Sequence, residues 1–197
     1  MAIEIREPTL LDITFIGANL RPEDYRETMC QLPAGTRGST AMAAIYYDLP
    51  PGWSWIAYDN GQPVAVFGFQ PMTVSVWSAW ALGTRRMTRA IPAITRWCWG
   101  QEQRLIDAGV RRLEARTIEG HHQAHRWLER LGCTRVCELP DHGRDGELFY
   151  LYAWHLGAGR PTQNSRYRIR THVPENPQAA EGAGTHPAAP AAEQDGR

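Results

Sequence analysis

The spacing of hydrophobic positions at the start of the chain predicts one strand and three helices. Residues 3–6 alternate between isoleucine and charged side chains, which is the period of a strand. Thr9 stands three residues before Asp12, an arrangement typical of a capped helix start, and an apolar run follows it. Pro22 begins a second helical segment, in which acidic residues of the first turn complement the helix dipole. Residues 39–49 predict a third, short helix.

Three strand-like runs follow, and together they predict an antiparallel meander. Residues 53–59 and 64–70 are joined by Asn60-Gly61, a dipeptide typical of a tight hairpin turn. Residues 74–82 form the third run.

After Gly83 the period becomes helical. The pattern predicts a single helix that ends at Gly109. Pro92 is expected in the first turn of this helix, where proline is tolerated. The apolar face of the helix consists of Ile91, Ile94, Cys98 and Leu105.

The following segments complete a mixed sheet. Residues 111–118 predict a strand, residues 121–132 a helix with a glycine C-cap, and residues 134–139 and 147–156 two closing strands. A meander followed by a β-α-β crossover predicts an α/β fold. We expect a predominantly antiparallel sheet of six or seven strands, with helices on both faces.

The composition changes near residue 157, which predicts a domain boundary. Residues 1–156 carry the periodic pattern, whereas residues 157–197 form a Pro/Ala/Gly-rich tail. Its last part, residues 174–197, has almost no bulky apolar side chain and buries too little surface to fold alone. The tail is therefore expected to be disordered or ordered by a partner.

Charge is distributed unevenly along a chain whose net charge is zero. Residues 1–84 carry four Arg and eight acidic residues, whereas residues 85–135 carry eleven Arg and five acidic residues. The local excess predicts either an anion site or a solvated basic face. The neutral total gives no whole-molecule attraction to nucleic acid or membrane, so neither is expected as a partner.

The N-terminal segment and the cysteines favour an intracellular setting with reduced thiols. MAIEIREP is charged and lacks the apolar segment of a secretion signal, and no apolar run approaches the ~20 residues of a membrane span. Cys133 and Cys137 lie on one predicted strand at a separation of about 13 Å, which excludes a disulfide between them.

The segment EGHHQAHRWLERLGCTR resembles the late helix of the GNAT superfamily of N-acetyltransferases, whose pattern is N-x-x-A-x-x-F-Y-x-K-x-G-F. His121 takes the position of the Asn. The last six lettered positions hold Ala124, Trp127, Leu128, Arg130, Gly132 and Cys133. The opening IREPTLLDI and the element order are also similar to those of the family. The resemblance covers roughly residues 1–155 and implies acetyl-CoA as cofactor.

The resemblance also implies where the cofactor would bind. The family's cofactor loop, [Q/R]-x-x-G-x-[G/A], aligns with Arg85 to Ala90, and its backbone N–H groups and helix N-terminus would hold the pyrophosphate. Thr88 replaces the middle glycine, where a Cβ opposes close backbone approach. The expected cofactor-binding residues are Leu82, Gly83, Arg85, Arg86, Thr88, Arg89, Ala90 and His121. A solvated basic helix start is the alternative for the three arginines.

The catalytic residues implied by the family are not found in the sequence. The Tyr that protonates the leaving thiolate is replaced by Leu128, which has no proton to donate. Tyr150 and Tyr152 are not placed at the thioester by any spacing. Glu114 is the best candidate for a general base, with pairing to neighbouring Arg as the alternative. The catalytic residues are therefore unknown, and acetyl-CoA binding is expected to be vestigial.

Histidine spacing gives a weak metal pattern. His121 and His125 lie one helical turn apart, as zinc ligands do, but no third and fourth ligands follow at a standard spacing. A polar helix start is the alternative, and no metal site is predicted.

The segments SAWALGT and NLRPEDYRE resemble a subgroup of acyltransferase-like internal virion proteins of short-tailed phages. This resemblance implies a virion or assembly component with little or no transferase activity, located in the host cytoplasm and then in the virion. Its partners would be other virion proteins, bound through the tail and exposed aromatic residues. The alternatives are an active acyl-CoA-dependent N-acyltransferase acting on a small-molecule or protein amine, and a toxin-antidote or antibiotic-modifying enzyme.

Overall fold

The computed structural model describes residues 3–157, so the predicted tail lies outside the described residues except at its first position. The elements are β1 (Ile3–Arg6), α1 (Leu10–Ala18), α2 (Pro22–Met29), α3 (Gly38–Asp48), β2 (Ser54–Asp59), β3 (Gln62–Pro71), β4 (Val76–Gly83), α4 (Met87–Gly100), α5 (Glu102–Asp107), β5 (Arg112–Ile118), α6 (His122–Leu131), β6 (Thr134–Leu139) and β7 (Phe149–His155).

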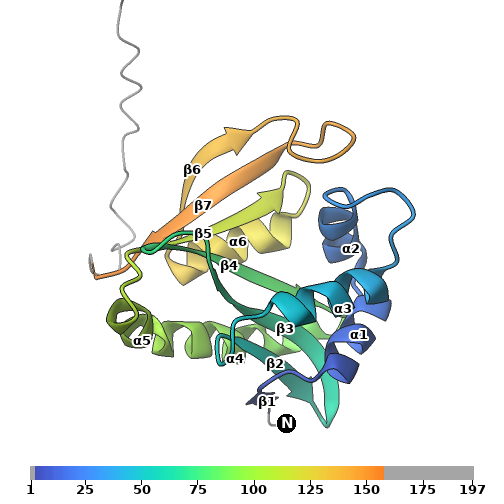
Figure 1. The fold of residues 1–197 in the computed structure, drawn as a ribbon, viewed down its shortest axis with the longest axis horizontal. Helices are drawn as coiled ribbons and strands as arrows, with labels where there is room; N and C mark the ends of the chain where they lie inside the picture. Colours follow the sequence, from blue (N-terminus) through green and yellow to red (C-terminus); the bar gives the residue numbers. More distant parts are fainter. Residues whose placement is uncertain (1–2, 158–197) are drawn as a thin grey trace, which may run out of the picture. The chain divides into compact units, whose positions relative to one another are not determined.

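The strands form one seven-stranded sheet in the order β1-β2-β3-β4-β5-β7-β6 (Figure 1). β4 and β5 are parallel, and every other pair of neighbours is antiparallel. The predicted meander is confirmed as β2-β3-β4. Asn60 and Gly61 form its first turn at φ 53° and 74°, the positive values that a two-residue hairpin requires. The α/β fold class is confirmed as well.

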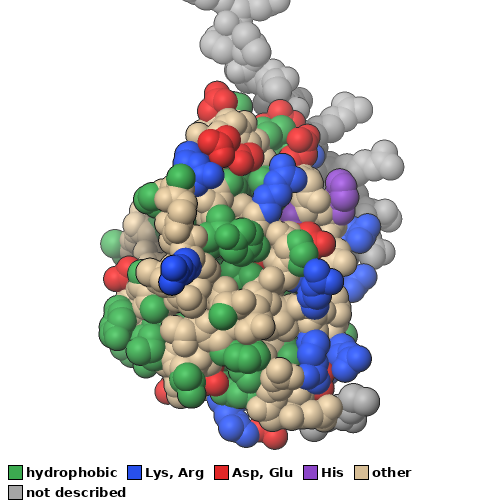
Figure 2. All heavy atoms as spheres, turned by 90° about the vertical axis from the view of Figure 1, so that its right-hand side faces the viewer, with side chains coloured by type: hydrophobic (Ala, Val, Ile, Leu, Met, Phe, Trp, Pro, Cys, Tyr) green, Lys and Arg blue, Asp and Glu red, His purple; other side chains and the backbone are tan. Residues whose placement is uncertain are grey.

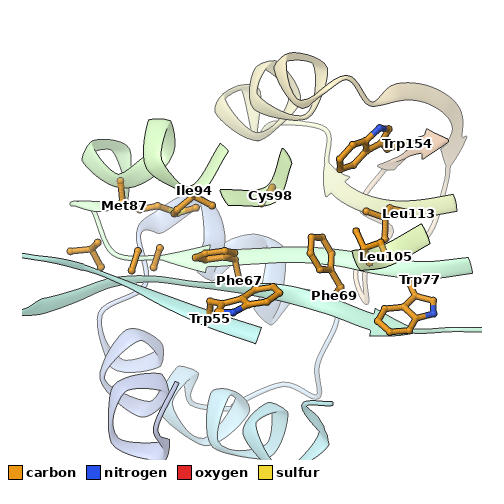
Figure 3. Packing of buried hydrophobic residues seen from close by; sticks show 14 of the residues in the cluster. Trp55, Phe67, Phe69, Trp77, Met87, Ile94, Cys98, Leu105, Leu113 and Trp154 are labelled. Atoms are coloured by element: carbon orange, nitrogen blue, oxygen red, sulfur yellow. The ribbon is translucent and has the colours of Figure 1, made fainter. Parts of the chain in front are cut away.

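Two main cores cover the two faces of the sheet, and two minor clusters of buried residues lie along β5 and β7. The larger one lies between α4 and the strands, and Figure 3 shows Ile94 and Cys98 of α4 with Phe67 and Trp55 of the sheet. The smaller one lies under α1 and α3, which contribute Ile13 and Met42 among others. Side chains alternate across β4, so Trp77 packs in the first core and Trp80 against the second. Burial of apolar surface on both faces is what holds the helices to the sheet.

The prediction of a single helix from Gly83 to Gly109 is wrong. α4 ends at Gly100, and α5 begins at Glu102. Gln101 donates its N–H to Cys98 O in a short i→i−3 bond, which tightens the last turn and allows the axis to change.

The placement of Pro92 in a first turn is also wrong. The helix begins at Met87, whose N–H bonds to Thr84 O, so Pro92 lies in the helix interior. Proline has no N–H and cannot pair with the carbonyl of Thr88, which stands four residues earlier.

A close approach between α1 and α3 depends on two glycines. A Cβ built at Gly17 would lie 2.5 Å from Gly38 O, and one at Gly38 would collide with Gly17 O. Because the obstacles are backbone atoms, neither contact is relieved by a side-chain rotation.

We expect Gly38→Ala to destabilise the fold by about 1–3 kcal/mol, because α3 must move away from α1 to admit the methyl group. Gly100→Ala is the matched control: a Cβ there meets nothing within 4 Å, and alanine favours the helix. Urea unfolding followed by circular dichroism measures both variants. Equal midpoints for the two would contradict this account of the helix contact.

Candidate functional site

A cavity lies where β4 and β5 diverge. Their parallel pairing covers only Val76–Ser78 and Arg112–Glu114, and beyond it β4 has no partner strand on this side. A cavity of about 640 Å³ occupies the gap, with Ser78 to Leu82 on one wall and Leu113 to Thr117 on the other.

Small side chains give this cavity its width. Ala79 and Ala81 of β4 and Ala115 of β5 are all on its walls, and Ala124 of α6 is opposite. Larger apolar groups close one side: Cys98 of α4 with Trp127, Leu128 and Leu131 of α6. The remaining walls come from β3, from Trp154 of β7, and from α2, α3 and the loop between them. Polar and charged side chains are interspersed with the apolar ones.

Helix α2 bridges the open ends of the two strands. Asp24 Oδ2 accepts the N–H of Gly83 at 2.7 Å, and the N–H of Arg21 donates to Gly83 O at 2.9 Å. On the other strand, Glu27 Oε2 accepts the N–H of Ile118 at 3.0 Å and the hydroxyl of Thr117 at 2.6 Å. Two carboxylates one turn apart on α2 thus satisfy backbone donors that the divergence leaves without a strand partner.

Arg21, Asp24 and His121 form a buried polar cluster at this point, exposed by only 6%, 2% and 2%. His121 Nδ1 accepts the N–H of Ala124 at 3.4 Å and caps α6, so Nε2 carries the proton that is donated to Asp24 Oδ1 at 2.8 Å. Arg21 Nε lies 2.8 Å from the same oxygen as an ion pair without hydrogen-bond geometry. Arg21 Nη1 donates to Gln123 Oε1 at 3.1 Å. The cluster therefore ties α2 to α6.

Burial changes the ionisation of several groups that line the cavity. Desolvation raises the pKa of Glu27, and hydrogen bonds from Thr117 and the Ile118 N–H oppose this rise. Burial raises the pKa of Cys98 and of Cys133 to about 12, so both thiols stay protonated near neutral pH.

The residues predicted to bind the cofactor lie in different surroundings in the structure. Leu82 lines the cavity, Gly83 is held by α2, and His121 lines the cavity from the other side. Thr88 lies in a second, smaller groove, described below, and Ala90 is buried in the core. Arg85 is exposed.

Arg86 and Arg89 are paired with an internal carboxylate. Arg86 Nη2 lies 2.8 Å and Arg89 Nη1 3.5 Å from Asp59 Oδ2, at the end of β2. Asp59 is only 1% exposed, and the hydrogen bond from Arg86 lowers its pKa. Any phosphate at these two arginines would compete with Asp59. Whether the loop residues hold a cofactor stays a prediction.

The candidate catalytic groups from the sequence are placed as follows. Glu114 lines the cavity, but its Oε1 accepts a hydrogen bond from Arg112 Nε at 2.8 Å, which is the alternative role predicted for this residue. Leu128 lines the cavity where the resemblance expects a tyrosine. The hydroxyl of Tyr152 forms a hydrogen bond of 2.9 Å with His125 Nδ1. Tyr150 and Tyr152 are not on the cavity lining themselves, but they pack against Ala115, Leu128 and Cys133, which are.

Sequence reasoning missed Arg21, Asp24 and Glu27. The helix dipole alone explains acidic residues at the start of this helix, and it requires no tertiary partner. The available signal was the i, i+3 spacing of Asp24 and Glu27, which puts both carboxylates on one helix face. That spacing is too common on solvated helices to identify a site.

Metal and membrane features are absent from residues 3–157. No three His, Cys, Asp or Glu side chains in this range are grouped so that they could hold a metal ion. No helix in the same range is long and apolar enough to cross a membrane. All four cysteines are free.

Comparison with known proteins gives a consistent structural result. No protein-family model matches the chain, and no curated protein matches its sequence. Among solved structures, Ard1 from Thermoplasma volcanium is similar with a TM-score of 0.60 at 13% identity, over 79% of this chain and 99% of that one. An acetyltransferase of the GNAT family from Bacillus anthracis gives 0.58 at 13% identity, over 79% and 95%.

The protein yncA from Salmonella typhimurium, solved with its cofactor acetyl-CoA, gives a TM-score of 0.58 at 12% identity, over 80% of this chain and 96% of that one. At such low identities the likeness concerns the fold. The described chain has the fold of the GNAT N-acetyltransferases.

Proposed function

We propose that the cavity between β4 and β5 binds the pantetheine arm of an acyl-CoA-type thioester. The observation that carries this proposal is the unpartnered edge of β4 beside a cavity of about 640 Å³. Backbone groups of successive residues point to alternate sides of a strand, so those of Ala79 and Ala81 face the same gap as those of Gly83. An extended ligand with amide groups pairs well with such an edge. Similarity to a fold solved with acetyl-CoA supports the choice of ligand.

We propose that the cavity binds the thioester donor but catalyses acyl transfer weakly or not at all. Leu128 supplies no proton to a leaving thiolate, and the two thiols that line the cavity hold their protons too tightly to replace a tyrosine effectively. The leading hypothesis is therefore a GNAT-fold protein with a vestigial acetyl-CoA site. Its assignment as a virion or assembly component of a short-tailed phage rests on the sequence resemblance alone.

The second candidate function is an active N-acyltransferase, and the carboxylate of Glu27 favours it. In this reaction the amine nitrogen attacks the thioester carbonyl and its proton passes to Glu27. The C–S bond then breaks, and the thiolate takes a proton from water. Glu27 suits the role of base because it lines the cavity, its pKa is raised, and the hydrogen bonds from Thr117 and Ile118 go to Oε2 alone. Both oxygens of Glu114 instead face guanidinium groups, those of Arg112 and Arg116.

We expect Ala81→Leu to weaken binding of CoA by at least about tenfold, because the added side chain fills the wall along which the ligand would lie. Ala108→Leu, at the exposed end of α5, is the control and should leave binding unchanged. Isothermal titration with CoA up to millimolar concentration measures both. Equal heats for the two variants, or none with the native chain, would refute donor binding in this cavity.

If the chain is an enzyme, Glu27→Gln should lower the rate of CoA release from acetyl-CoA and an amine by about 10²–10⁴. Because the base acts when ionised and burial raises its pKa, the native rate should rise with pH through a value above the ~4.3 of an ordinary Glu. Glu114→Gln should retain most of the rate. A loss with Glu114→Gln alone would overturn the assignment of the base, and no native turnover would leave the binding-only function.

If the chain is a virion component, mass spectrometry of purified particles should detect it at a constant ratio to the capsid protein. Deleting residues 157–197 should abolish incorporation if the tail is the anchor. Incorporation of the truncated chain at the native ratio would exclude the tail, and absence of the full chain from particles would exclude the virion role.

A further inference from the structure

A second groove lies between α4 and α6. It has a volume of about 200 Å³. Its lining consists of Arg21, Thr88, Ile91, Gln123, Ala124, Arg126, Trp127 and Arg130. Three of these side chains are Arg and none is acidic. Arg21 is paired with Asp24 behind the wall, so the uncompensated positive charge of the groove comes from Arg126 and Arg130.

This groove continues the cavity between β4 and β5. Arg21, Ala124 and Trp127 line both, and the buried guanidinium of Arg21 stands at the boundary. The two helices are fixed to each other here, since Trp127 Nε1 donates to Thr95 Oγ1 at 2.9 Å. A ligand whose pantetheine arm fills the cavity would thus extend into a basic groove.

The arginines of this groove differ in availability from those of the turn between β4 and α4. Arg126 and Arg130 lie one turn apart on α6 and are exposed, and neither forms a hydrogen bond or ion pair within residues 3–157. Arg86 and Arg89 are already paired with Asp59. Arg85 of the same turn is exposed and forms no hydrogen bond or ion pair within residues 3–157, but it does not line the groove. The free cations that line the groove are therefore on α6. Figure 2 shows one face of the molecule, on which several basic side chains lie along one margin and others are scattered over the rest of the face.

We propose that Arg126 and Arg130 bind the phosphate groups at the nucleotide end of the thioester donor, with Arg21 at the entry to the arm's cavity. The assignment rests on the proposed donor binding and deepens it. Phosphate recognition by this chain uses guanidinium groups of α6, because Thr88 adds a Cβ where the loop would approach closely, Asp59 engages Arg86 and Arg89, and Arg85 lies outside the groove. Charge-assisted pairs of this kind weaken with salt.

The experiment compares CoA with pantetheine, which has the same arm and no phosphate, by isothermal titration on the full chain. Native protein should bind CoA more tightly than pantetheine. The double variant Arg126→Ala/Arg130→Ala should lose on the order of 30-fold in affinity for CoA and less than about twofold for pantetheine. Its residual CoA binding should depend less on salt. Arg96→Ala/Arg111→Ala, two exposed arginines outside the groove, removes the same charge and is the control.

Each outcome separates the two proposals. If CoA and pantetheine bind native protein equally, or the α6 variant binds CoA as the control does, the phosphate assignment is wrong and donor binding stands. If the control variant loses CoA affinity to the same extent, non-specific charge attraction explains the loss, and the groove is not the phosphate site. If neither ligand binds native protein, donor binding fails and the phosphate site fails with it. Competition by inorganic pyrophosphate against CoA, but not against pantetheine, would further support the groove as the phosphate site.

Discussion

The divergence of β4 and β5 is the constraint on which the rest of the site depends. Where the two strands separate, backbone N–H and C=O groups lose their strand partners, and a buried donor left unpaired costs about 1–3 kcal/mol. α2 meets this requirement with Asp24 at Gly83 and Glu27 at Ile118. The helix thereby fixes the separation of the two strand ends, and the gap behind it remains wide enough to be a cavity.

The same contacts link the cavity between β4 and β5 to the groove between α4 and α6. Asp24 holds Gly83 with one oxygen and His121 with the other, and His121 caps α6. The groove between α4 and α6 is thus set in position by the residue that closes the strand gap. Burying this network is favourable only because each charge has a partner, so a change at Asp24 would affect the strand end, the helix cap and Arg21 together.

Elements that depend on neighbouring residues in the sequence were predictable, whereas contacts between residues far apart in the sequence were not. The Asn60-Gly61 turn, the Thr9 cap and the period changes at Gly83 and near residue 120 depend on neighbours in sequence, so the sheet and helices followed from them. The break between α4 and α5 depends on a single tightened turn, which periodicity does not resolve. Asp24 and Glu27 pair with residues 59 and 91 positions away, and no spacing rule reaches that far.

The arginines show why a charge count along the chain cannot locate an anion site. Arg86, Arg89, Arg126 and Arg130 contribute equally to the basic segment that the sequence revealed. In the fold, Asp59 comes from the distant strand β2 to pair with the first two, whereas the last two form no ion pair within residues 3–157. Binding and chemistry are then separable properties of one scaffold. Under the proposed function, a strand edge, a cavity and free cations would hold a phosphorylated thioester, whereas Leu128 has no proton to give to the leaving thiolate.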